Sequence, residues 1–175
     1  MNRKPIVAVV GGSTVSEKLM GAAELIGWEL VNAGYRVATG GLGGVMTAAS
    51  GGARKADGWS DGDVIGVLPG LRADDANEFV DIAIPTGMNT ARNVVLVNMA
   101  DVVIAVGGGA GTLSEIALAW QHGKAIIALD MGEGWSAKLA GHRIDNMRVG
   151  KILRAPNPAV AVQLVGKALA QTRMD

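Results

Sequence analysis

The sequence contains no cysteine among its 175 residues. This absence excludes disulfide bridges, thiolate metal sites and thiol nucleophiles, and it makes the cytoplasm the expected location. An excess of charge is also absent, since 16 Lys and Arg balance 16 Asp and Glu to a formal net charge of zero. Because nucleic-acid binding usually requires a broad basic surface, we expect no nucleic-acid partner.

Long apolar runs are missing too, and none approaches the roughly 18 residues that a membrane-spanning helix needs. Residues 1–5 lead directly into a strand pattern, without the apolar segment and cleavage site of a signal peptide. We therefore expect a soluble cytoplasmic protein with no membrane partner. Hydrophobic residues still make up 49% of the chain, which is long enough for one domain with a substantial core. We predict a single domain over residues 1–175.

Short apolar runs alternate with helical patterns along the chain. The runs predict buried strands at residues 6–10, 35–39, 64–68, 79–84, 102–106, 125–129 and 149–154. The patterns between them predict helices at residues 14–32, 45–56, 88–100 and 112–123, with a further helix after residue 158. This alternation is typical of an α/β domain with a single doubly wound, mostly parallel sheet, that is, a Rossmann-like fold.

Three glycine-rich loops follow strands in this scheme. In doubly wound sheets ligands bind at the carboxyl ends of the strands, where glycines let a ligand approach the backbone and the helix that follows directs free N–H groups toward an anion. One such loop alone could serve only a tight turn, but three at one edge favour a phosphate site. The residues predicted to contact the ligand from these loops are Gly11, Gly12, Ser13, Gly41, Gly44, Gly107, Gly108, Gly109, Gly111 and Thr112.

Two helix starts carry the spacing of a capping box, in which a Thr caps the helix and a Glu three residues on reaches back to it. We predict this arrangement for Thr14 with Glu17. For Thr112 with Glu115 two interpretations stay open, a capping box or a ligand site. In the second, the Thr112 hydroxyl binds phosphate, and Glu115 faces the sugar or ring because a carboxylate repels phosphate.

Arg92 falls in the first turn of the predicted helix 88–100 if Asn89 or Thr90 caps it. A cation there opposes the helix dipole, so we favour a role in meeting an anion with the planar guanidinium. The alternative is an ordinary surface salt bridge with Asp101 or Glu115. Asn93 can add amide hydrogen bonds to the same ligand.

Other site types fit the sequence poorly. The G-x-G-x-x-G pattern of dinucleotide-binding folds fails at Thr112, where a glycine is needed, and no Walker A sequence is present. His122 and His142 have no partners at the spacing of metal ligands, and the acidic turn at residues 57–63 lacks the pattern of a calcium loop. We predict no metal site.

The residues from Gly107 to Thr112, together with Glu115, resemble the PGGxGTxxE signature of the Lonely Guy (LOG) superfamily. Residues 40–46 (GGLGGVM) resemble its second glycine loop. Residues 87–101 (GMNTARNVVLVNMAD) are similar to the branch that contains the molybdenum-cofactor carrier proteins, a branch also described as DprA/Smf-related. The similarity covers nearly the whole chain.

The resemblance implies a Rossmann-like fold, homodimers or homotetramers, and a phosphorylated ligand on the GGxGT loop. For the carrier branch that ligand is molybdopterin, the organic part of the molybdenum cofactor. LOG enzymes instead cleave the N-glycosidic bond of nucleoside 5′-monophosphates, and their catalytic residues correspond to Arg92 and Glu115. Val106 and Asn93 replace a proline and a lysine of the LOG pattern. These departures favour binding of molybdopterin or a nucleotide by a carrier or sensor, with the phosphoribohydrolase as the alternative.

Overall fold

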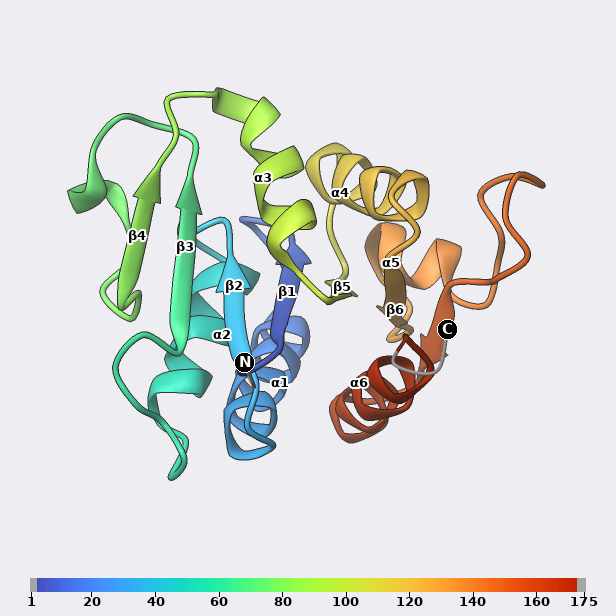
Figure 1. The fold of residues 1–175 in the computed structure, drawn as a ribbon, viewed down its shortest axis with the longest axis horizontal. Coiled ribbons are helices and arrows are strands. Elements are labelled where there is room, and N and C mark those ends of the chain that lie inside the picture. The colour runs from blue at the N-terminus through green and yellow to red at the C-terminus, as the bar shows by residue number, and fades with distance from the viewer. Residues whose placement is uncertain (1–2, 173–175) are drawn as a thin grey trace.

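Seven short parallel strands form one sheet in the computed structural model of this protein, which describes residues 3–172 (Figure 1). The strands are β1 (Ile6–Gly11), β2 (Arg36–Thr39), β3 (Val64–Leu68), β4 (Ile82–Pro85), β5 (Val102–Val106), β6 (Ala125–Leu129) and β7 (Leu153–Ala155). Their spatial order is β4-β3-β2-β1-β5-β6-β7, so the direction of winding reverses between β1 and β5. The predicted doubly wound α/β sheet is confirmed.

Helices cover both faces of this sheet (Figure 1). One face packs against α1 (Glu17–Asn32), α2 (Val45–Arg54) and α6 (Pro158–Thr172), and the other against α3 (Arg92–Met99), α4 (Ala110–Gln121) and α5 (Gly134–Leu139). Successive residues of a strand point to opposite faces, so Val9 joins the first core and Val10 the second. This double burial explains why the strands appear in the sequence as unbroken apolar runs.

Several predicted boundaries were wrong. The strand expected at residues 79–84 is Ile82–Pro85, because Asn77 organises a turn in which its side chain accepts a hydrogen bond from the Phe79 N–H. The last strand is Leu153–Ala155 rather than 149–154, and the helix expected to end near residue 56 ends at Arg54. Helix α5 lies in a segment without visible periodicity, since its six residues form less than two turns.

The predicted side-chain caps were also wrong. Helix α1 is capped by Ser16, whose hydroxyl accepts a hydrogen bond from the Leu19 N–H, and not by Thr14. Helix α3 begins at Arg92 after a 3₁₀ turn at Asn89–Ala91, so neither Asn89 nor Thr90 caps it. Helix α4 begins two residues earlier than expected, with Gly109 as its N-cap residue, which removes the capping-box interpretation of Thr112.

Three aspartates precede strands at the amino edge of the sheet. Asp101 accepts a hydrogen bond from the Ile6 N–H and pairs with Arg3, and Asp81 accepts one from the Val64 N–H. Burial disfavours the charged form of Asp63, but hydrogen bonds from Lys4 and Ser60 outweigh this and hold its pKa below the ordinary value. These carboxylates fix strand starts at the edge opposite to the glycine loops.

Among residues 3–172, the structure contains no helix with the length and hydropathy to cross a membrane.

Helices α1 and α2 touch backbone to backbone through two buried glycines. A Cβ atom on Gly27 of α1 would collide with the carbonyl oxygen of Ala49, and a Cβ atom on Gly52 of α2 would collide with the carbonyl oxygen of Glu24. The close contact holds α2 against α1 and thereby sets where the loop before α2 lies.

We expect Gly27→Ala to lower the free energy of unfolding by about 1–3 kcal/mol, the usual cost of forcing extra atoms into a packed interior. The matched control is Gly21→Ala, on the exposed side of the same helix, where a Cβ atom meets nothing within 4 Å. That change is expected to raise the stability by about 0.5–1 kcal/mol through helix propensity. Urea denaturation measures the free energy of unfolding of both variants. Equal values for Gly27→Ala and Gly21→Ala would disprove the close packing.

Candidate functional site

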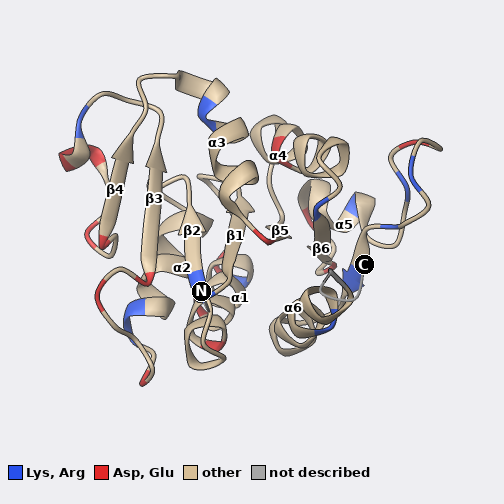
Figure 2. Cartoon of the chain, in the orientation of Figure 1, with Lys and Arg blue, Asp and Glu red and all other residues tan. Residues whose placement is uncertain are grey.

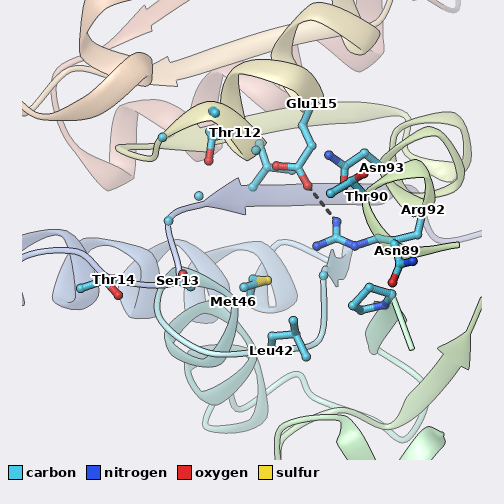
Figure 3. Close-up of a pocket in the computed structure, with 18 residues that line it drawn as sticks. Ser13, Thr14, Leu42, Met46, Asn89, Thr90, Arg92, Asn93, Thr112 and Glu115 are labelled. Carbon is cyan, nitrogen blue, oxygen red and sulfur yellow. Dashed lines mark hydrogen bonds and ion pairs between the residues drawn. The ribbon is translucent and has the colours of Figure 1, made fainter. Parts of the chain in front are cut away.

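A pocket of about 610 Å³ opens at the carboxyl edge of the sheet, where the winding reverses between β1 and β5 (Figure 3). This is the place at which doubly wound sheets bind ligands. Its walls are the segments after β1, β2 and β3 and the starts of α3 and α4. The lining residues are Val10, Gly11, Gly12, Ser13, Thr14, Gly40, Leu42, Met46, Pro69, Asn89, Thr90, Arg92, Asn93, Gly109, Ala110, Gly111, Thr112 and Glu115.

Most of the residues predicted to contact a ligand are brought together in this pocket. Those that line it are Gly11, Gly12, Ser13, Arg92, Asn93, Gly109, Gly111, Thr112 and Glu115. They come from three separate stretches of the chain, and Figure 3 labels Ser13, Arg92, Asn93, Thr112 and Glu115 among the residues that line the pocket. The convergence of the first and third glycine loops with the start of α3 is therefore a feature of the structure.

Four other predicted residues, Gly41, Gly44, Gly107 and Gly108, lie behind the pocket wall rather than on it. Gly44 has a φ of 67° and packs against the backbone of Gly12 and Ser13. The next N–H, that of Val45, donates to the Gly12 carbonyl over 3.0 Å. The second glycine loop thus supports the first loop from behind.

The loop between β5 and α4 is held by the start of α5. The buried Ser136 hydroxyl accepts a hydrogen bond from the Gly107 N–H and donates one to the Leu129 carbonyl, each 2.7 Å long. The Trp135 and Ser136 N–H groups donate to the Gly108 and Gly107 carbonyls. Three of these hydrogen bonds fix the loop that presents the N-terminus of α4 to the pocket, and the fourth anchors Ser136 to the end of β6.

Helix α4 directs unused backbone donors toward this space. The first hydrogen bond of its ladder runs from the Leu113 N–H to the Gly109 carbonyl over 3.0 Å. The N–H groups of residues 110–112 precede that bond and have no partner within the helix. With the positive end of the helix dipole they form a seat that suits an anion.

Arg92 and Glu115 form a buried ion pair at the wall between α3 and α4 (Figure 3). The Arg92 Nη1 atom lies 2.9 Å from Glu115 Oε1, and the two side chains are only 11% and 7% exposed. Of the two ion-pair partners considered for Arg92, the structure shows Glu115, in a buried pair and not in the surface salt bridge of the alternative interpretation. Asp101 pairs with Arg3 instead. Burial raises the pKa of Glu115, and the charge and hydrogen bond of Arg92 offset this effect only in part.

Arg92 is not fully satisfied by this pair. Its Nε atom is buried and has no hydrogen-bond partner among the described residues. The end of its guanidinium lies so close to Gly40 that a Cβ atom there would collide with it. Gly40 therefore gives the arginine room, a role that the sequence pattern did not reveal because the two residues lie far apart in the chain.

Part of the pocket wall was not predicted from the sequence. Leu42, Met46 and Pro69 add apolar groups to the pocket lining. Asn89 and Thr90 add polar groups near Arg92 (Figure 3). Leu42 lies in the second glycine loop and Met46 in the first turn of α2, whereas the sequence predicted that Gly41 and Gly44 of this loop contact the ligand. Pro69 directly follows β3, and its position at a strand end is the signal that could have identified it.

Within residues 3–172, no three His, Cys, Asp or Glu side chains gather closely enough to hold a metal ion.

The chain matches known proteins over nearly its full length. The model of the SLOG cluster4 family matches residues 4–172. The molybdenum cofactor binding protein from the phototrophic bacterium Rippkaea orientalis is 37% identical, with a TM-score of 0.82 over 95% of this chain and 98% of that one. The molybdenum cofactor carrier protein from Chlamydomonas reinhardtii is 32% identical, with a TM-score of 0.79 over 95% and 99%. An uncharacterised Archaeoglobus fulgidus protein is 40% identical over 123 residues, which are 70% of this chain and 78% of that protein.

A more distant likeness concerns DNA processing protein A from Helicobacter pylori, which is 18% identical with a TM-score of 0.69 over 93% of this chain and 80% of that one. At this identity the likeness shows a shared fold only. In Figure 2 the Lys and Arg positions are spread over separate elements, including α3 and the segment after α5.

We expect the stability of the protein to depend on the ionisation of Glu115. Because its pKa is raised in the folded state, its contribution to stability is greatest below the ordinary value of about 4.3 and is lost as the pH rises through the folded pKa. Glu115→Gln removes this loss and keeps an oxygen for Arg92. Urea denaturation between pH 4 and pH 8 should show the variant gaining stability relative to wild type as the pH rises. A constant difference across that range would contradict the raised pKa.

Proposed function

This chain belongs to the SLOG cluster4 family, and we propose that it binds a phosphorylated small molecule, the molybdenum cofactor or a nucleotide, as a carrier or sensor. One observation carries the proposal. Two glycine loops and the unused N–H groups of α4 meet in a single pocket at the point where the sheet reverses its winding. The two related proteins named for the molybdenum cofactor support this choice of ligand.

In this proposal the phosphate binds at the N-terminus of α4. The donors are the N–H groups of residues 110–112 and the Thr112 hydroxyl, and Gly11, Gly12 and Ser13 line the same pocket. Backbone donors hold a phosphate without the cost of ordering long side chains, and the helix dipole adds to their attraction. Gly41, Gly44, Gly107 and Gly108 act indirectly, by shaping these loops.

The rest of the pocket suits a flat heterocycle such as a pterin or a purine. Leu42, Met46 and Pro69 offer an apolar surface, whereas Asn89 and Asn93 supply amide groups for the polar edges of a ring. A volume of about 610 Å³ lies within the usual range for small-molecule sites. These residues fit the organic part of the molybdenum cofactor, which is the cargo in a carrier and undergoes no reaction there.

The alternative is a phosphoribohydrolase that acts on nucleoside 5′-monophosphates. The buried Arg92–Glu115 pair in the pocket wall favours it, because such a carboxylate can stabilise positive charge on a sugar or position a water. Incubation with AMP and an assay for free base and ribose 5-phosphate separates the two functions. If the wild-type protein releases base from AMP and Glu115→Gln abolishes this release, the protein is a hydrolase and not only a carrier.

We also propose that residues 1–175 form one domain, and that the protein acts in the cytoplasm as a homodimer or homotetramer without a nucleic-acid partner. The resemblance to the LOG superfamily implies the assembly, and the balanced charge supports the lack of a nucleic-acid partner. Light scattering coupled to size-exclusion chromatography measures the number of subunits.

The phosphate seat is tested by Gly111→Glu, with Gly111→Gln as the matched control. Gly111 is exposed in the first turn of α4, and a Cβ atom there meets nothing within 4 Å, so both variants are expected to fold. The added carboxylate should weaken binding of AMP or phosphopterin at least tenfold more than the amide does, because only the carboxylate repels phosphate. Isothermal titration calorimetry gives the Kd values.

Small molecules released from freshly purified wild-type protein should include a phosphorylated pterin or a nucleotide when analysed by mass spectrometry. Equal affinities in the Glu and Gln variants, together with no phosphorylated compound in the released fraction, would rule out a phosphate seat at α4.

A further inference from the structure

We propose that binding of an anionic ligand in this pocket is coupled to the uptake of one proton by Glu115. The inference rests on the proposed function, since it assumes that a phosphate or a similar anion binds at the start of α4. In this proposal, the protonation of Glu115 sets how the affinity for the ligand depends on pH.

The pocket contains one acid and one base among its described residues. Helix α4 contributes Glu115 and helix α3 contributes Arg92. The segments after β1, β2 and β3 that complete the wall contribute only uncharged residues. Because Arg92 is already paired with Glu115, the pocket offers an anion no net positive charge.

Glu115 lies next to the anion seat. It follows Thr112 by three residues on α4, and side chains at this spacing lie on the same helix face with Cβ atoms about 5–6 Å apart. An anion that accepts hydrogen bonds from residues 110–112 therefore comes close to a carboxylate that is only 6% exposed. Little water separates the two negative charges, so their repulsion is strong.

A proton on Glu115 removes this repulsion. Burial already favours the neutral form, and a second negative charge nearby favours it further. The proton comes from solvent and adds to a carboxylate oxygen of Glu115, which turns the ion pair into a neutral acid beside a free guanidinium. Arg92, whose Nε atom has no partner in the paired state, then becomes the positive charge that the ligand meets.

This coupling predicts a defined pH dependence. Where Glu115 is ionised in the free protein and protonated in the complex, each unit of pH decrease strengthens binding up to tenfold. At higher pH the carboxylate recovers Arg92 and the ligand is released more readily. The pocket would thus hold its ligand more tightly in a more acidic environment.

Sulfate is a suitable probe because it is a tetrahedral dianion that does not titrate between pH 5 and pH 8. Binding of sulfate to wild type and to Glu115→Gln is measured by isothermal titration calorimetry in buffers of different ionisation enthalpy, which gives the number of protons taken up. We expect close to one proton for wild type near neutral pH and none for the variant. At pH 8 the variant should bind sulfate at least tenfold more tightly than wild type.

A second measurement covers the case in which Glu115→Gln fails to fold. The ¹³C chemical shift of the Glu115 carboxyl group in labelled wild-type protein reports its protonation directly, and sulfate should move its titration to higher pH. The same titration, repeated with chloride at equal ionic strength, serves as the control.

The outcomes separate the two proposals. Sulfate binding without proton uptake, or with the same pH dependence in both proteins, overturns the coupling and leaves the anion site intact. Absence of sulfate binding at every pH in both proteins overturns the anion site and the coupling with it.

Discussion

The reversal of winding between β1 and β5 is the constraint on which the rest of the structure depends. The chain leaves β1 toward one face of the sheet and leaves β5 toward the other, so the loops after these two strands part and open a crevice between them. Every residue of the candidate site is placed relative to this crevice. The contact of α1 with α2 and the contact of α5 with the loop after β5 hold its two sides in position.

The two edges of the sheet differ in their charged groups. At the amino edge, Asp63, Asp81 and Asp101 accept hydrogen bonds or pair with basic side chains, and two of them bind N–H groups at strand starts. At the carboxyl edge, backbone N–H groups provide the attraction, and the single ion pair between Arg92 and Glu115 leaves the pocket electrically neutral. In the proposed function, backbone dipoles attract the anion while Glu115 is ionised, and Arg92 adds a free positive charge once Glu115 takes up a proton. The ionisation of this one carboxylate therefore sets the charge of the pocket.

The accuracy of the sequence-based prediction varied with the range of the interactions involved. Strands β3, β5 and β6 were predicted at their observed limits, because a strand buried on both faces is an apolar run and can be recognised alone. The cap predicted at Thr14 was wrong, and neither the cap considered at Asn89 or Thr90 nor the capping-box alternative for Thr112 is found in the structure. The same residue pattern serves several turn geometries, and the preceding loop decides among them. The observed limits of the fourth strand differ from the predicted ones for a similar reason, because Asn77 organises a turn just before it.

The sequence by itself determined the doubly wound sheet and the positions of the glycine loops, and it singled out Arg92 and Glu115 as candidate site residues, because strand burial and the helix dipole act over a few neighbouring residues. Only the tertiary structure decided that Arg92 pairs with Glu115, that Gly40 makes room for the arginine, and that Leu42, Met46 and Pro69 form a pocket wall. These relations join residues from different strand ends. These contacts form only when the sheet brings the strand ends to one edge. A pattern of neighbouring residues cannot show which strand ends become neighbours.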